Sequence, residues 1–138
     1  PWMGDAVELF LDLRPESELG KPEYGPGVYQ IFAVPADSIH NKPMLRVWQP
    51  DGHYLDNAQI ASIATGDFWA VEISIPWKSL TESPVHTGRA IGFEAVLDDL
   101  DEGDYAHRQM IWRGGAENWR DPSLFSRLIL VDHPRRRF

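Results

Sequence analysis

The chain has 138 residues, of which 43% are hydrophobic and 25% charged, a composition typical of one folded domain. Acidic residues outnumber basic ones by 21 to 13, and the formal net charge of -8 argues against a nucleic-acid partner, whose phosphate backbone it would repel. Cysteine is absent, which excludes disulfides and thiolate metal sites, and no apolar run reaches the ~20 residues that a membrane-spanning helix needs.

Short segments in which hydrophobic and polar residues alternate indicate β-strands. In the first segment, residues 5–12, we expect Val7, Leu9 and Leu11 on one face of a strand, and the residues between them on the other. Residues 14–27 are rich in Pro, Gly and Glu and predict a loop.

Two further strands are predicted at residues 28–34 and 44–49, with a polar, proline-containing loop between them. Residues 68–76 show the clearest strand pattern, which Pro76 ends because proline has no N–H to donate. The remaining strands are expected at residues 90–99, 109–112 and 127–132. About seven short strands and no helix longer than a turn or two predict an antiparallel β-sandwich.

We therefore predict a single all-β domain over residues 1–138, with two sheets packed in an immunoglobulin-like or jelly-roll-like manner. Only short helical turns are expected beside the strands. The chain begins at Pro1 with neither an initiator methionine nor a signal sequence, which we interpret as a piece of a longer protein.

Four stretches of the chain resemble the family 9 carbohydrate-binding domains and their β-sandwich relatives. In chain order they are WMGDAVELFLD (residues 2–12), WAVEISIPWKSL (69–80), GRAIGFEAVLDDLD (88–101) and ENWRDPSLFSRLIL (117–130). The most specific part is Ile-Pro-Trp followed by Leu80 and then by the Ile-Gly-Phe segment. The resemblance implies a non-catalytic module that binds the ends of sugars or polysaccharides and directs an attached enzyme to them.

Such a module is expected outside the cell, in the periplasm or on the cell surface. Members of the family usually carry additional strands before the segment that begins here at Trp2. A sandwich without its first strands exposes sheet edges, so we expect either another chain that completes it or a homo-oligomer.

The resemblance also implies a binding slot between two tryptophans, with acidic and amide side chains beside them. Trp2 and Glu8 match the first tryptophan and the acidic residue, whereas Asn118 and Trp119 lie in the loop that carries the amide and the second tryptophan. Gln30 stands where the family has an arginine on the next strand, so that contact differs here.

Sugar rings pack their C–H patches on aromatic faces, while their hydroxyl groups need polar partners. Among the six tryptophans, Trp69 and Trp77 are expected in the core, whereas Trp48 suits either the core or a ligand. Arg46 lies two residues earlier and is a further candidate ligand contact. In the alternative interpretation, Glu8 lies on a solvated face or pairs with a cation such as Arg46 across the sheet.

An acidic segment follows the strand predicted at residues 90–99. Calcium binds several oxygen ligands at once, and a run of carboxylates can supply them, although the spacing does not complete an EF-hand loop. Family members often hold structural calcium, so the resemblance makes calcium the one expected cofactor. Its candidate ligands are Asp98, Asp99, Asp101 and Asp104, and a solvated loop is the alternative.

No catalytic constellation is found in the sequence. The five histidines lack the spacing of a zinc site, and neither a G-x-S-x-G motif nor a glycine-rich phosphate loop occurs. Two other functions stay open beside sugar binding. One is a b-type haem domain with Met3, Met44 or Met110 as an axial ligand. The other is a structural or assembly sandwich without sugar binding, which the glutamine at position 30 favours.

Overall fold

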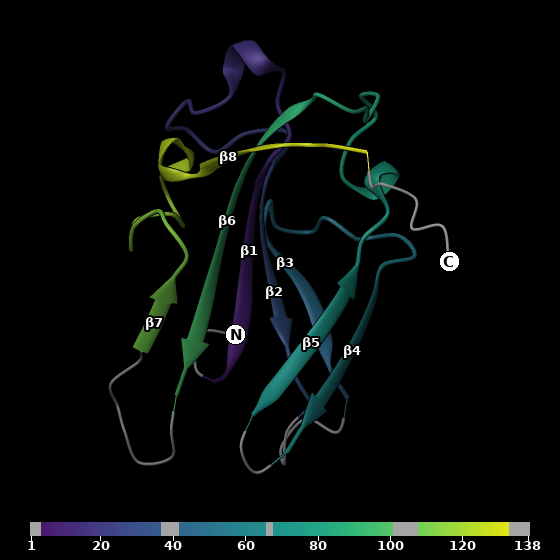
Figure 1. The fold of residues 1–138 in the computed structure, drawn as a ribbon, viewed down its shortest axis with the longest axis vertical. Helices are drawn as coiled ribbons and strands as arrows, with labels where there is room; N and C mark the ends of the chain where they lie inside the picture. The colour runs from purple at the N-terminus through teal and green to yellow at the C-terminus, as the bar shows by residue number, and fades with distance from the viewer. Residues whose placement is uncertain (1–3, 37–41, 66–67, 101–107, 133–138) are drawn as a thin grey trace.

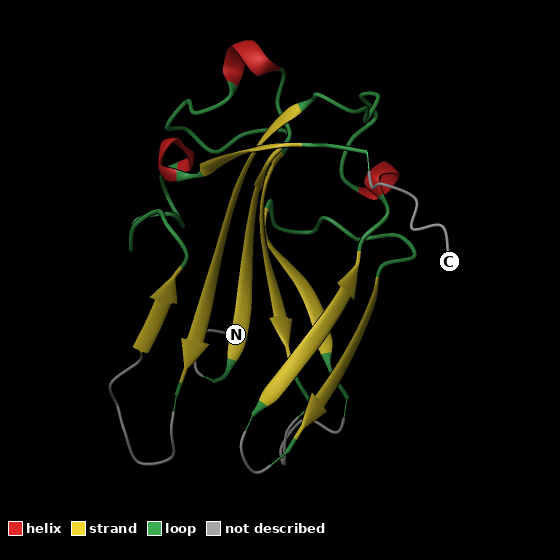
Figure 2. Cartoon of the chain, viewed as in Figure 1, coloured by secondary structure: helices red, strands yellow, loops and turns green. Residues whose placement is uncertain are grey.

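The computed structural model describes residues 4–36, 42–65, 68–100 and 108–132. This part of the chain forms eight strands in two antiparallel sheets, and the predicted all-β sandwich is confirmed (Figure 1). Three short 3₁₀ turns accompany the strands, at Glu16–Glu18, Trp77–Ser79 and Pro122–Leu124 (Figure 2). Within the described ranges, no helix has the length and apolar composition needed to cross a bilayer.

The larger sheet has six strands, and the longest of them, β6, holds two partners along one edge. In spatial order the strands are β3 (Met44–Gln49), β2 (Val28–Val34), β1 (Ala6–Asp12), β6 (Ala90–Asp99) and β7 (Arg108–Ile111). β8 (Ser126–Ile129) pairs with residues 90–93 of β6, and β7 pairs with residues 96–99. The loop of residues 112–125 joins β7 to β8 and therefore leaves the sheet beside the middle of β6.

The smaller sheet consists of β4 (Gln59–Ala64) and β5 (Trp69–Ser74), and it crosses β2 and β3 at an angle in Figure 1. In β5, Trp69 and the alternate residues after it are half-buried while those between them are exposed, as the pattern predicts. β4 was missed because Ile60 and Ile63 lie three residues apart, which does not fit the two-residue period of a strand.

β1 has the predicted alternation, but both of its faces are covered. Glu8 lies between Phe32 and Val96 of the neighbouring strands, and Leu9 lies between Ile31 and Ala95. The alternative interpretation in which Glu8 lies on a solvated face is wrong, because Glu8 is only 4% exposed. A central strand of a six-stranded sheet is flanked on both edges, and here the second face is covered as well.

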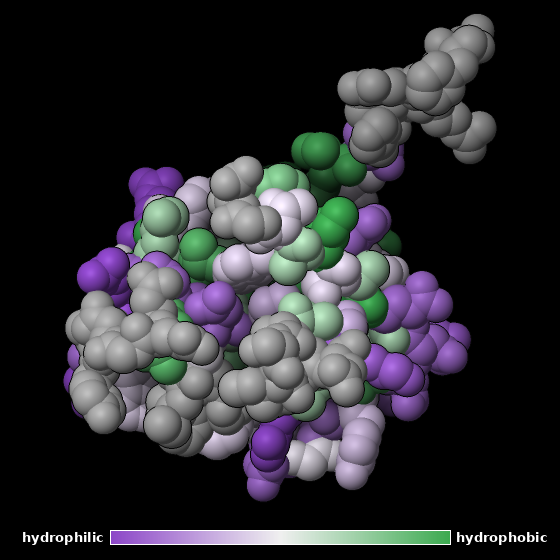
Figure 3. All heavy atoms as spheres, turned by 90° about the horizontal axis from the view of Figure 1, so that it is seen from below, coloured by the Kyte–Doolittle hydropathy of each residue, from purple (hydrophilic) through white to green (hydrophobic). Residues whose placement is uncertain are grey.

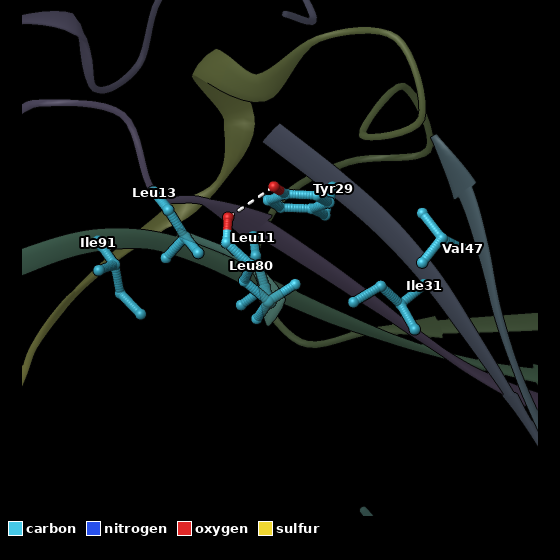
Figure 4. Close-up of a cluster of buried hydrophobic side chains, with 7 residues drawn as sticks. All are labelled: Leu11, Leu13, Tyr29, Ile31, Val47, Leu80 and Ile91. Carbon is cyan, nitrogen blue, oxygen red and sulfur yellow. Dashed lines mark hydrogen bonds between the residues drawn. The ribbon is translucent and has the colours of Figure 1, made fainter. Parts of the chain in front are cut away.

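The hydrophobic core lies on the Leu9 side of the sheet (Figure 4). Its buried cluster consists of Leu11, Leu13, Tyr29, Ile31, Val47, Leu80 and Ile91. The Tyr29 hydroxyl donates a 2.6 Å hydrogen bond to the carbonyl of Leu80, which joins the 3₁₀ turn after β5 to the large sheet (Figure 4). Trp77, expected in the core, is 40% exposed, because the turn inserts Leu80 into the core instead.

The loop predicted at residues 14–27 is organised around a buried ion pair. Arg14 donates to the Asp12 carboxylate at 2.7 and 2.9 Å and to the carbonyls of Lys21 and Glu23. These bonds fold the loop back onto the end of β1. The loop also carries Tyr24, whose hydroxyl group donates a hydrogen bond to the carbonyl of Asn118.

At the end of the molecule seen in Figure 3, the visible described residues intersperse hydrophilic with hydrophobic side chains. Several large hydrophobic residues are exposed, such as Ile63 and Phe68 around the β4–β5 connection. Completion of the sandwich by another chain therefore stays a prediction.

Replacing Ile31, which is fully buried in the core cluster, tests this assignment. We expect Ile31→Ala to lower the free energy of unfolding by about 2–5 kcal/mol, because it removes buried atoms and leaves a cavity. The matched control is Ile63→Ala on the 59% exposed Ile63, which should change it by no more than about 0.5 kcal/mol. Urea unfolding measures both, and equal effects would contradict the assignment of the core.

Candidate functional site

A pocket of about 450 Å³ lies on the face of the large sheet opposite the core. Five strands and the loop after β7 contribute its walls, so residues far apart in the sequence meet in it. The lining residues are Glu8, Phe10, Gln30, Phe32, Trp48, Val96, Gln109, Ile111, Gly115, Ala116, Asn118 and Trp119. Most are apolar or aromatic, with a few polar groups among them, which is the usual composition of a small-molecule site.

The polar part of the pocket is a network of carboxyl and amide groups around Glu8. Gln30 Nε2 donates to Glu8 Oε2 at 2.6 Å, and Gln49 Nε2 donates to Gln30 Oε1 at 3.2 Å. On the other side, Gln109 Nε2 lies 3.4 Å from Glu8 Oε1 and 2.9 Å from Asp98 Oδ1. Residues of five adjacent strands are thereby connected into a row of hydrogen-bonding groups.

The electrostatics of this row raise the pKa of Glu8 to about 8. Burial is the main cause, because it disfavours the charged form, and the neighbouring charge of Asp98 adds to it. The hydrogen bond from Gln30 opposes both effects by stabilising the carboxylate. Glu8 is therefore mostly protonated at neutral pH and can donate as well as accept a hydrogen bond.

Two tryptophans from different elements provide aromatic surface. Trp48 is half-buried and packs edge-on against Phe32, with ring centroids 6.2 Å apart. Trp119 is 52% exposed on the loop after β7. Each carries a guanidinium group over its ring, Arg46 at 5.4 Å from the Trp48 centroid and Arg120 at 5.7 Å from the Trp119 centroid.

Arg46 does not meet the other predicted site residues. It lies opposite Phe32, which separates it from Glu8 across the sheet, and it lines a separate groove formed with residues 51–58. The expected cross-strand ion pair between Glu8 and Arg46 is not formed, because Glu8 bonds to the glutamine amides instead.

Glu94 positions the loop that carries Trp119. Where β7 separates from β6, the buried Glu94 carboxylate accepts the backbone N–H groups of Ala95, Arg113 and Gly114. Glycine is required at position 114, because a Cβ atom there would lie 2.5 Å from Asn118 Oδ1 and 2.9 Å from Glu94 Oε2.

Asn118 is the residue that this loop presents to the pocket from a buried position, with 2% of its surface exposed. Its Oδ1 accepts from the Gly115 N–H at 3.1 Å, which leaves Nδ2 as the free end of the amide, a buried donor without an acceptor. The backbone is held from two sides. Tyr24 donates to the carbonyl of Asn118 at 2.8 Å, and Gln49 donates to that of Trp119 at 2.8 Å.

The structure thus brings together Glu8, Gln30, Asn118 and Trp119 among the predicted ligand contacts. Trp2 lies outside the described residues. The sequence reasoning missed Phe10, Phe32 and Gln109, which line the same pocket. A usable signal was present, because Phe10 and Phe32 each lie two residues from Glu8 or Gln30 and so share their face of the sheet.

The aspartates predicted to bind calcium do not form a described cluster. Asp98 is fully buried and bonded to Gln109, whereas Asp99 is exposed on the opposite face of β6, so the two do not fit one metal ion. Asp101 and Asp104 lie outside the described residues. No group of three or more His, Asp and Glu side chains able to hold a metal is found in the described part, and calcium stays a prediction.

The candidate haem ligands are likewise separated. Met44 and Met110 lie on β3 and β7, at opposite edges of the large sheet, and Met3 lies outside the described residues. Among its described lining residues, the pocket has neither methionine nor histidine.

Glu94→Gln tests how the loop is held. Both carboxylate oxygens accept N–H groups, so an amide places its NH₂ against one of them in either orientation. We expect the substitution to lower the free energy of unfolding by about 1–3 kcal/mol. Glu117→Gln, at an exposed ion pair with Arg120 on the same loop, is the control and should cost less than about 1 kcal/mol. Similar losses in urea unfolding would refute the role of Glu94.

The raised pKa of Glu8 predicts a pH dependence of stability. Between the ordinary value of 4.5 and about 8, the folded state holds a proton that the unfolded state has released, so stability falls as pH rises through this window. We expect Glu8→Gln to remove that loss, with a gain over the original chain that grows by at most about 1.4 kcal/mol per pH unit. Urea unfolding at about pH 5 and about pH 9 measures it, and a constant difference between the two proteins would contradict the shifted pKa.

Comparison with known proteins places this site in context. Two solved structures of a family 9 carbohydrate-binding module from Caldicellulosiruptor kristjanssonii have a similar fold. The complex with cellotriose gives a TM-score of 0.71 at 19% identity over 100% of this chain, and the complex with glucose gives 0.72 at 18% identity over 98%. The chain spans 63% of the length of each of these structures.

A search of curated proteins finds no match. A family model does match, over residues 1–133, and it describes the carbohydrate family 9 binding domain-like proteins. The match spans nearly the whole chain and agrees with the observed β-sandwich. The chain belongs to the family of carbohydrate family 9 binding domain-like proteins.

Proposed function

We propose that this domain is a non-catalytic module that binds the end of a sugar chain in the pocket around Glu8. The observation that carries the proposal is the pocket itself, in which aromatic side chains surround a buried row of carboxyl and amide groups. A sugar needs both at once, because its C–H faces pack on rings while its hydroxyl groups need hydrogen-bond partners.

Each group has a role in this proposal. Trp119 offers an exposed ring for stacking, and Trp48 closes the opposite part of the wall. Glu8 and Gln109 provide both donors and acceptors for hydroxyl groups. Asn118 Nδ2 is a buried donor without an acceptor, and a sugar oxygen would satisfy it, which removes the cost of leaving it unpaired.

Neutral glucans are the first ligands to test. The similar modules were solved with cellotriose and with glucose, and the pocket volume of about 450 Å³ suits one or two sugar units. Nothing in the network resembles a pair of catalytic carboxyls, because Glu8 and Asp98 lie together with a glutamine between them instead of on two sides of an open space.

In the biological setting that we propose, the module would hold an attached enzyme close to a polysaccharide. Such substrates are found outside the cell, so the domain would work in the extracellular space, in the periplasm or on the cell surface. A calcium ion, if this module holds one as its family members often do, would have a structural role.

Titration calorimetry with glucose and cellotriose tests the proposal. We expect saturable binding that Trp119→Ala weakens by about tenfold or more, because stacking on an aromatic face contributes on the order of 1 kcal/mol beyond the buried area. Trp77→Ala is the matched control, since Trp77 is 40% exposed but lies outside the pocket. Binding that both variants weaken equally would place the site elsewhere, and a folded domain that binds neither sugar would count against the proposal.

A further inference from the structure

The charge of the pocket is one-sided. Among its described lining residues, Glu8 is the one ionisable side chain, and neither lysine, arginine nor histidine belongs to the lining. The buried carboxyl group of Asp98 adjoins it through Gln109. A chain with a formal net charge of -8 also attracts cations at long range. The site therefore favours a positively charged ligand over an anionic one.

The walls of the pocket favour a cation as well. The rings of Phe10, Phe32, Trp48 and Trp119 all belong to the lining. Aromatic faces attract ammonium groups electrostatically, and more strongly where water is excluded. The two guanidinium groups nearby contact Trp48 and Trp119 from outside the lining, and that of Arg120 is paired with Glu117.

From this geometry we propose that the pocket selects a sugar unit with a free, protonated amino group, as in a deacetylated amino-sugar polymer, over the neutral hexose. This inference rests on the proposed sugar-binding function and specifies its ligand. The ammonium group would face Glu8 among the aromatic rings. Asn118 is only 2% exposed, and its amide would donate to an oxygen of the same sugar ring.

The proton balance of binding follows from the groups around Glu8. Among the described residues, Asp98 on β6 disfavours a second negative charge at the Glu8 carboxyl, whereas Tyr24, on the loop before β2, has its own pKa raised by burial and by the charge of Glu8. The empty site therefore keeps a proton on Glu8 at neutral pH. An ammonium group replaces it: the Glu8 carboxylic acid gives its proton to the buffer, and the resulting carboxylate pairs with the bound cation. A neutral sugar requires no such exchange.

Titration calorimetry of the intact chain distinguishes the two ligand classes. Glucosamine, glucose and N-acetylglucosamine are compared at about pH 6, where the free amine is protonated, in buffers of different ionisation enthalpy. We expect glucosamine to bind at least about tenfold more tightly than the other two sugars. The apparent binding enthalpy of glucosamine should vary with the ionisation enthalpy of the buffer, because the buffer takes up to one proton released on binding. The binding enthalpy of glucose should not depend on the buffer.

Two variants provide the matched comparison. Glu8→Gln should abolish the preference for glucosamine, measured as the ratio of the two dissociation constants, together with the proton release. Glu72→Gln removes an exposed carboxylate of β5 and should leave the ratio unchanged. If Glu8→Gln does not fold, the buffer dependence of the original chain still decides.

The other outcomes separate the two proposals. Equal or weaker binding of glucosamine than of glucose would overturn the amino-sugar inference and leave the sugar-binding function intact. Ethanolamine that binds as tightly as glucosamine would show selection of an amine alone and overturn the sugar part. Failure of every sugar to bind would overturn both.

Discussion

The buried carboxylate of Glu94 is the interaction on which the pocket depends. Along one edge, β6 pairs with β7 over one part of its length and with β8 over another. In the chain after β7, the backbone N–H groups of Arg113 and Gly114 have no partner strand. Glu94 accepts both from within the sheet. The chain can therefore leave the sheet after β7, and the segment that carries Asn118 is held beside the pocket.

The central strands are unusual in that both of their faces are buried while one of them is polar. Glu8, Asp12, Glu94 and Asp98 are all at most 4% exposed, and each carboxyl group needs compensation for its lost hydration. Asp12 has Arg14, and Glu94 has three backbone N–H groups. Glu8 bonds to the amides of Gln30 and Gln109, which are weaker partners than cations, so its burial is only partly compensated.

The incomplete compensation of the buried Glu8 carboxyl group connects the stability of the fold with the proposed binding. A polar face arranged only for folding would be expected to place a cation beside Glu8, whereas here Arg46 lies over a tryptophan ring away from it. In the proposed complex, a sugar oxygen would satisfy the buried amide of Asn118, and a bound cation would compensate the buried carboxylate of Glu8. Sugar binding would then increase the free energy of unfolding of the domain.

The sequence by itself determined the positions of the strands other than β4, the alternation of β1 and the family resemblance, because strand periodicity and local motifs are properties of neighbouring residues. It also predicted Glu8, Gln30, Asn118 and Trp119 as ligand contacts, and the structure places these four in one pocket. Only the tertiary structure decided the rest. The burial of Glu8, its separation from Arg46 and its contact with Gln109 of β7 depend on which strands become neighbours, and pairing between distant segments has no signature in the local pattern.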